Sequence, residues 1–188
     1  MEEIIIKALN TAYECHKNET RKGSDFPYYV HILDVAKYLM YETKDKEIIC
    51  AGILHDTLED SDYTKEEIIT NFGERVFNLV NFCTEPGNTP DASDDEQKTS
   101  WKKRKEHSIN TLNGADSDEL LVFVSDKLAN LLSMQEDLIN GVDVWTKFNA
   151  PKKEIKWYYE SILREVEHKL KDTRLFKIFK KRIEEVFE

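Results

Sequence analysis

The sequence is poor in the residues that cross-link, kink or loosen a chain, and it has no long hydrophobic run. Its three cysteines, Cys15, Cys50 and Cys83, lie far apart. That spacing excludes a disulfide framework and a zinc knuckle as the basis of the fold. Six glycines and four prolines are too few for a fibrous or disordered chain. No apolar stretch approaches the ~18–20 residues that a membrane-spanning helix needs.

An excess of basic charge is also missing. The chain has 27 lysines and arginines against 37 aspartates and glutamates, which gives a formal net charge of −10. Because phosphate backbones and anionic lipid surfaces attract a basic face, this balance argues against a nucleic-acid binder and a membrane-surface binder. It is compatible with a small anionic substrate held by a few local cations. The acidic start Met1-Glu2-Glu3 does not fit a signal peptide, so we expect a cytoplasmic protein.

Helical periodicity, in contrast, runs along the whole chain. The length is that of one ordinary domain, and we expect residues 1–188 to form a single all-α bundle. The predicted helices are 2–18, 27–39, 45–58, 64–73, 76–80, 101–112, 116–138, 149–170 and 173–187. Residues 85–99, which are rich in acidic and small polar residues, are predicted to form a long, mobile and exposed loop. Whether this loop closes over a substrate as a lid is left open by the sequence.

Several of the apolar helices carry a single group that can bind a metal ion. His55 and Asp56 stand at the end of a helix that is apolar nearly all round, and His31 lies in the apolar pattern of the helix before it. Asp126 follows another apolar run. Taken singly, each is better explained as a core histidine or a buried cap or ion-pair partner. Taken together, two imidazoles and two carboxylates favour Mn²⁺ or Fe²⁺ over a closed structural zinc site.

Two more carboxylates follow the His-Asp pair. Glu59 comes four residues after His55, so we expect both side chains to share one helical face. A carboxylate beside a metal site is a natural general acid or base for an attacking water. The alternative interpretation of Glu59 and Asp60 is a solvated acidic turn before the helix that Thr64 opens.

Positive charge is concentrated at two places in this acidic chain. Arg21 and Lys22 precede the His31 helix, and four consecutive basic residues run from Lys102 to Lys105. Either group could hold phosphates through charge-assisted hydrogen bonds. The alternative for the second group is an ordinary solvated helix face. Tyr158 could stack on a nucleobase, although an aromatic side chain at helical spacing is more often part of the core.

Four short segments along the chain contain most of the residues discussed above. They are His16 with Arg21-Lys22, Pro27-Tyr28 with His31, His55-Asp56-Thr57-Leu58-Glu59-Asp60 with Thr64, and Ser125-Asp126-Lys127-Leu128-Ala129-Asn130. Together they resemble the HD superfamily of metal-dependent phosphohydrolases, and within it the hydrolase domains of RelA/SpoT-type enzymes and the small alarmone hydrolases. His-Asp alone is a weak signal, but His-Asp followed three residues later by Glu-Asp is much more specific.

This resemblance implies an HD-type helical bundle with one Mn²⁺ per chain. The implied metal ligands are His31, His55, Asp56 and Asp126. Glu59 and Asp60 would be the acid/base pair that positions the attacking water, Arg21 and Lys22 would hold the substrate, and Asn130 would lie beside the nucleotide. Lys102, Lys105 and Tyr158 are further candidates for substrate binding.

The implied reaction removes the 3′-diphosphate of guanosine tetra- or pentaphosphate and releases pyrophosphate and GDP or GTP. The expected partner is thus a guanine nucleotide, and neither nucleic acid nor a membrane. Two alternatives stay open: an HD-type nucleotide phosphatase with another substrate, and a catalytically silent nucleotide-binding module. The second alternative needs no general base, so the intact Glu59-Asp60 pair argues against it.

Overall fold

The computed structural model describes residues 3–22, 24–84 and 94–188, and for residues 94–99 it describes the backbone alone. Helices dominate this part of the chain, which confirms the all-α prediction. The elements are α1 (Glu3–His16), α2 (Tyr29–Glu42), α3 (Lys46–Leu54), α4 (Thr57–Asp60), α5 (Lys65–Phe72), α6 (Glu74–Cys83), α7 (Asp94–Leu112), α8 (Ser117–Ile139), the 3₁₀ helix η1 (Val144–Lys147), α9 (Lys152–Leu170) and α10 (Arg174–Phe187). Among the described residues, none of the helices combines the length and the apolar character needed to cross a membrane.

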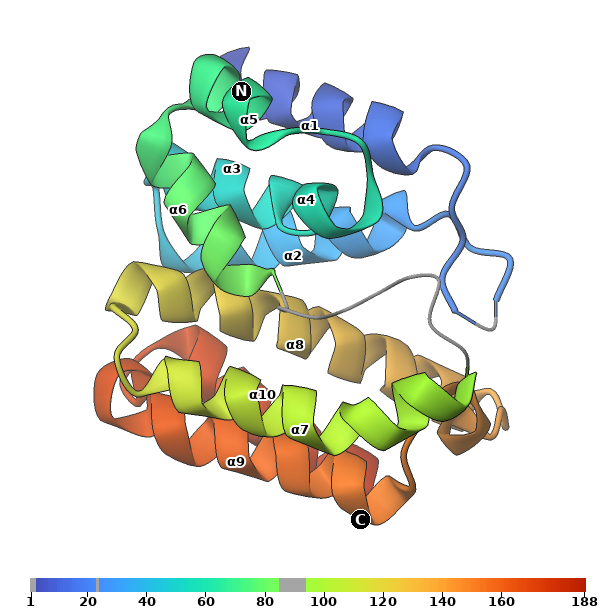
Figure 1. The fold of residues 1–188 in the computed structure, drawn as a ribbon. Helices are drawn as coiled ribbons and strands as arrows, with labels where there is room; N and C mark the ends of the chain where they lie inside the picture. The colour runs from blue at the N-terminus through green and yellow to red at the C-terminus, as the bar shows by residue number, and fades with distance from the viewer. Residues whose placement is uncertain (1–2, 23, 85–93) are drawn as a thin grey trace.

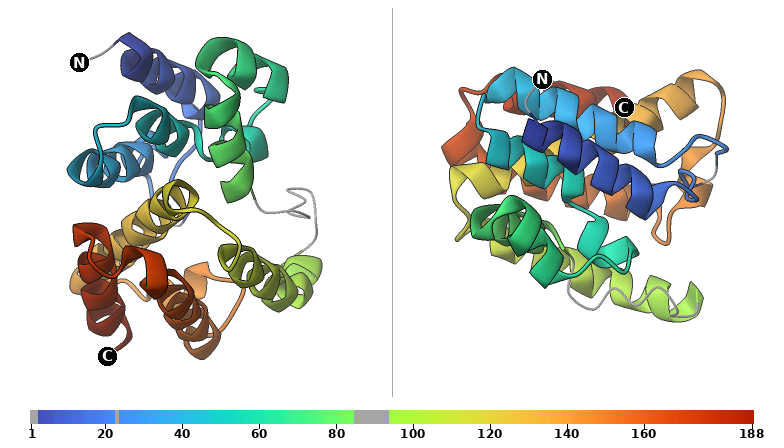
Figure 2. Two further views of the ribbon diagram at one scale, coloured as in Figure 1. Left: turned by 90° about the vertical axis from the view of Figure 1, so that its left-hand side faces the viewer. Right: turned by 90° about the horizontal axis from the view of Figure 1, so that it is seen from above.

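The helices form two groups with α8 between them (Figure 1). One group holds α1 to α6, and the other holds α7, α9 and α10. Helix α8 contacts α2, α3 and α6 on one side and α9 and α10 on the other. The left view of Figure 2 shows the same division end-on. A side chain in the middle of α8 can therefore meet residues from the first group while the rest of the helix is anchored in the second.

The sequence of α8 explains why it serves both groups. Asp116 caps its first turn, and Glu119 closes the capping box. Val122 and Ala129 belong to the core cluster of α1 to α6, whereas most other buried residues of α8 belong to the core cluster with α9 and α10. Asp126 lies four residues after Val122 and three before Ala129. Helical periodicity thus places its carboxylate on the face that meets the first group.

Helix α3 is the most deeply buried element, because every residue from Ile48 to Leu54 is buried. The sequence predicted one helix over 45–58, and here the structure differs. Helix α3 ends at Leu54, and a separate short helix, α4, begins at Thr57. The Thr57 hydroxyl donates to the Leu54 carbonyl at 2.7 Å, in competition with the helical backbone bonds. His55 and Asp56 therefore stand at a break, where both side chains can turn toward one point.

One other predicted boundary also needs correction. The segment 85–99 was predicted to be a loop with a helix starting at 101, but α7 begins at Asp94. Polar composition suggested a loop there, yet acidic residues are also favoured in the first turn of a helix. Residues 85–93 lie outside the described part of the chain. The predicted mobile loop, and its possible role as a lid, fall largely within these residues. The short η1 was not predicted, since one turn gives no periodicity to detect.

Gly52 lets α3 approach α2 closely. A Cβ atom at this position would come within 2.1 Å of Leu39 Cδ1. The Leu39 side chain is fully buried and has little room to move away. We expect Gly52→Ala to lower the free energy of unfolding by about 1–2 kcal/mol, because overpacking outweighs the ~1 kcal/mol of helix propensity that alanine brings. Thermal or urea unfolding measures this. Gly114→Ala is the control, since nothing lies within 4 Å of its Cβ position, and equal destabilisation of both variants would contradict the expectation.

Candidate metal centre and substrate cavity

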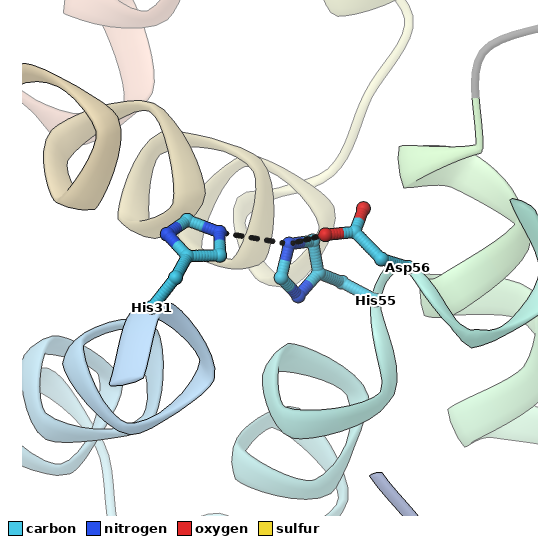
Figure 3. A group of neighbouring side chains, drawn as sticks. All are labelled: His31, His55 and Asp56. Carbon is cyan, nitrogen blue, oxygen red and sulfur yellow. Dashed lines mark hydrogen bonds and ion pairs between the residues drawn. The ribbon is translucent and has the colours of Figure 1, made fainter. Parts of the chain in front are cut away.

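Two histidines and two aspartates lie close together, and both aspartates approach the imidazole nitrogens. Figure 3 shows His31 from α2 facing His55, with Asp56 beside it. The Nε2 atoms of the two imidazoles are 3.4 Å apart, and Asp56 Oδ2 is 2.7 Å from His55 Nε2. Asp126 Oδ1 approaches from α8, at 3.2 Å from His31 Nε2 and 3.7 Å from His55 Nε2. The structure thus brings together all four residues that the sequence suggested as metal ligands.

Hydrogen bonds from neighbouring groups hold these side chains in place. The carbonyl oxygen of Gly52 lies 2.9 Å from His55 Nδ1, which makes Nδ1 the donor and turns Nε2 to the cluster. The Tyr28 hydroxyl donates to Asp56 Oδ2. On Asp126, Lys127 Nζ binds Oδ2 at 2.6 Å and the Asn130 amide binds Oδ1 at 2.7 Å. Fixed orientation of this kind is what a metal site requires.

Burial and charge shape the protonation of the cluster. His31 and His55 are only 4% and 2% exposed, so water is almost excluded from them. Burial lowers the pKa of His31 in spite of its hydrogen bond with Asp126, which favours the neutral imidazole. Burial alone would also lower the pKa of His55, but the charge of Asp56 and hydrogen bonds to both aspartates raise it to about 10.

The two carboxylates are kept ionised. Burial would raise the pKa of Asp56, but the neighbouring His55 lowers it to about 2. For Asp126, the effect of burial is outweighed by the Lys127 ammonium and the imidazoles, which hold its pKa well below the usual range. Carboxylates that draw a proton onto a buried imidazole this strongly would also stabilise a divalent cation. The donor set, two nitrogens and two oxygens, fits such an ion.

Glu59 and Asp60 lie in α4, directly after the cluster. The expectation that Glu59 and His55 share one helical face fails, because the helix is broken between them. The carboxylates nevertheless line the same cavity of about 540 Å³ as Asp56 and Asp126. Desolvation and the charges of Asp56 and Glu59 raise the pKa of Asp60 to about 7. A group with that pKa can give or take a proton near neutral pH.

A larger cavity of about 930 Å³ adjoins the cluster at His31. The candidate substrate-binding residues that line it are Arg21, Lys22, Lys105, Asn130 and Tyr158. Arg21 donates from Nη2 to Asn130 Oδ1 at 2.7 Å, and Asn130 in turn donates to Asp126. This chain of hydrogen bonds ties the cationic wall of the cavity to a candidate metal ligand.

Lys102 is placed differently from the other candidates. It does not line either cavity beside the cluster, among the residues that the structure describes. Its ammonium pairs with Glu154 and lies 3.2 Å from the centre of the Trp157 ring. Lys102 therefore joins α7 to α9, and the solvated-face interpretation describes it better than phosphate binding does.

Sequence reasoning gave no role to two residues that the structure places at the cluster. Tyr28 contacts Asp56 and also packs its ring 5.4 Å from that of His31. Lys127 is the ion-pair partner of Asp126 and lines both cavities. The sequence contained a feature that could have pointed to each residue: Tyr28 stands one helical turn before His31, and Lys127 directly follows Asp126.

The raised pKa of Asp60 predicts a pH-dependent stability difference. Between the ordinary carboxyl pKa of 3.8 and about 7, the folded protein holds a proton that the unfolded chain has released, so stability falls as pH rises. Asp60→Asn removes this penalty. In the presence of a chelator we expect its melting temperature to exceed the wild-type value by ~2 °C at pH 8 and to match it near pH 4, with the shift kept small because Asp60 is exposed.

Calorimetry at both pH values measures this difference. Asp62→Asn, at an exposed position two residues away, is the control and should keep the wild-type pH dependence. A lower melting temperature of Asp60→Asn at pH 8 would contradict the prediction.

Comparison with known proteins gives consistent matches. A family model described as "HD domain" matches residues 8–153. A guanosine-3′,5′-bis(diphosphate) 3′-pyrophosphohydrolase of Aquifex aeolicus is 38% identical over 132 residues, which are 70% of this chain and 18% of that protein. The guanosine-3′,5′-bis(diphosphate) 3′-pyrophosphohydrolase MESH1 of Danio rerio is 34% identical over 131 residues, 68% of this chain and 67% of that protein. The matched region is thus a small part of the bacterial relative and about two thirds of the fish protein.

Solved structures extend the likeness to the fold. The crystal structure of lmo0812 from Listeria monocytogenes is 30% identical, with a TM-score of 0.72 over 88% of this chain and 100% of that one. A metazoan ortholog of SpoT that hydrolyses ppGpp has a TM-score of 0.75 at 22% identity, over 98% of this chain and 96% of that one. At that identity the second match shows the fold alone.

Proposed function

The chain belongs to the HD-domain family, and on this premise we propose that it is a Mn²⁺-dependent guanosine-3′,5′-bis(diphosphate) 3′-pyrophosphohydrolase. Its substrates would be guanosine tetra- and pentaphosphate, and its products pyrophosphate with GDP or GTP. The observation that carries the proposal is the convergence of two imidazoles and two carboxylates next to the Glu59-Asp60 pair. The names of relatives that are about a third identical point to the same activity. We also propose a cytoplasmic location.

Membership of the HD family implies a divalent metal ion, and Mn²⁺ is the ion that we propose. Its ligands would be His31, His55, Asp56 and Asp126. When bound, such an ion supplies Lewis-acid chemistry: it stabilises charge on the phosphoryl oxygens and lowers the pKa of water. A borderline set of imidazole nitrogens and carboxylate oxygens suits Mn²⁺.

The other residues of the site would bind the substrate and move protons. Glu59 would accept a proton from the attacking water, and Asp60 would exchange a proton with the leaving 3′-oxygen. Arg21 and Lys22 would hold phosphate oxygens through charge-assisted hydrogen bonds. Asn130, fixed between Arg21 and Asp126, would position the nucleotide.

Product analysis tests the proposal. Purified protein is incubated with guanosine tetraphosphate and Mn²⁺, and GDP, pyrophosphate and orthophosphate are resolved by ion-exchange chromatography. We expect equal amounts of GDP and intact pyrophosphate, and no turnover when a chelator is present. Release of orthophosphate would instead indicate a general nucleotide phosphatase, and a bound but unchanged nucleotide would indicate a silent binding module.

A further inference from the structure

The candidate metal centre lies between two cavities of different size. The larger one has a volume of about 930 Å³ and the smaller one about 540 Å³. His31 borders the larger cavity, whereas Asp56 and Asp126 border the smaller one. The residues that line both cavities, and so mark their junction, are Tyr28, Asp60, Lys105, Lys127, Asn130 and Tyr158. A substrate whose reacting atom lies at the cluster would therefore extend into both spaces.

The two cavities differ in chemistry. Outside the shared residues, the larger cavity combines aromatic and aliphatic side chains such as Phe148 and Leu132 with charged groups. The charged residues are the cations Arg21, Lys22 and Lys147 and the carboxylates Glu19, Asp34, Glu136 and Asp137. That mixture suits a nucleoside with its 5′-phosphates. The smaller cavity instead has compact polar side chains from the end of α6 and from α7, namely Asn81, Thr84, His107, Ser108 and Thr111. Hydroxyl, amide and imidazole groups of this kind can donate hydrogen bonds to a small anion.

The position of Glu59 assigns a direction to the reaction. Of these two cavities, Glu59 lines only the smaller one. In phosphoryl transfer the attacking and leaving oxygens lie roughly in line on opposite sides of the phosphorus. If Glu59 receives the proton of the attacking water, that water enters from the smaller cavity, and the 3′-oxygen of the nucleoside leaves toward the larger one.

From this geometry we propose that the smaller cavity is the binding site of the pyrophosphate product, while GDP leaves through the larger cavity; this inference rests on the proposed function. The water oxygen forms a new bond to the phosphorus next to the ribose. The bond between that phosphorus and the 3′-oxygen breaks, and its electron pair stays on the 3′-oxygen. One proton passes from the water to Glu59, and Asp60 gives one proton to the 3′-oxygen. Inversion moves the phosphorus toward the side of the water, so pyrophosphate is formed facing the smaller cavity.

The side chains of the smaller cavity fit this product. Asn81 and His107 are exposed, and both lie at the cavity wall. The Ser108 hydroxyl lies 3.3 Å from the Tyr158 hydroxyl at the junction of the cavities. Lys105 and Lys127 contribute positive charge from the shared wall, which offsets the carboxylates behind the anion. Pyrophosphate would thus meet donors on the α6 and α7 sides and the metal centre on the other.

A comparison of product binding in two matched variants tests the assignment. Calorimetry measures the Kd of pyrophosphate and, separately, of GDP for Mn²⁺-loaded protein at a constant excess of free Mn²⁺. The double variant Asn81→Ala/His107→Ala changes only the smaller cavity, and Lys22→Ala changes only the larger one. All three positions are exposed, so the fold should tolerate the substitutions. We expect the double variant to weaken pyrophosphate about tenfold and GDP less than about twofold, as for the loss of hydrogen bonds to a charged group, and Lys22→Ala to do the reverse.

Unchanged pyrophosphate affinity in the double variant, or equal weakening of both ligands by either variant, would overturn the assignment. Because the products bind without turnover, this result is independent of the activity. Wild-type protein that binds both products as expected but releases no pyrophosphate from guanosine tetraphosphate would contradict the proposed function instead.

Discussion

The Asp56→Ala variant is expected to lose bound Mn²⁺ and turnover together. Asp56 is one of the four residues that we propose as metal ligands, and its Oδ2 lies 2.7 Å from His55 Nε2. Removing it also frees the Tyr28 hydroxyl and withdraws the charge that raises the pKa of His55. Changes in groups that only orient ligands already cost ~10–100-fold in metal affinity or activity, so loss of a ligand should cost more than ~100-fold in both.

Metal content after gel filtration and the steady-state rate measure this result. Asp172→Ala, an exposed aspartate far from the cluster in the sequence, is the matched control and should keep both properties. Melting curves recorded with a chelator show whether the variant is folded, and Asp56→Asn offers an isosteric substitute if it is not. Full Mn²⁺ content and a wild-type rate in Asp56→Ala would show that the metal centre lies elsewhere.

The Glu59→Gln variant should separate metal binding from turnover. Glu59 lines the cavity next to the cluster, but it is not one of the four residues that we propose as metal ligands. Glutamine keeps the shape of the side chain and removes its ability to accept a proton. We therefore expect Mn²⁺ content and nucleotide binding to stay at wild-type levels while kcat falls by ~10²–10⁴-fold, the usual contribution of a general base.

The split between kcat and metal content is the decisive measurement for Glu59. Glu66→Gln, at an exposed position in the first turn of α5, controls for the loss of one negative charge near this end of the protein. Loss of metal in Glu59→Gln would make Glu59 a ligand and not a base. An unchanged kcat would show that Glu59 is not the general base.

Much of the fold could be predicted from local sequence patterns. The capping boxes at Thr64 and Asp116 and the positive-φ glycine at Gly73 fix helix ends, because each satisfies backbone groups by itself. The approach of His31, His55, Asp56 and Asp126 also followed from their places in apolar patterns, since buried ionisable groups need one another or a metal ion. Their roles, like that of Glu59, stay predictions until the variants are measured.

Other features depend on tertiary contacts that no local pattern contains. The break between α3 and α4 follows from the Thr57 side chain bonding to the backbone, in a segment whose apolar periodicity continues through it. Lys102 was grouped with Lys105 because both stand in one basic run, but Lys102 pairs with Glu154 of α9, and of the two only Lys105 lines the cavities. The division of the site into two cavities arises where α4, α6, α7 and α8 meet, and such a meeting cannot be read from one segment.

Hydrolysis in ¹⁸O-labelled water tests the central claim most directly. Guanosine tetraphosphate is turned over once by Mn²⁺-loaded protein, and the masses of the products are measured by mass spectrometry. If water attacks the phosphorus next to the ribose 3′-oxygen, one heavy oxygen appears in pyrophosphate and none in GDP. Heavy oxygen in orthophosphate or in the nucleoside would contradict the account, because the bond broken would then be a different one.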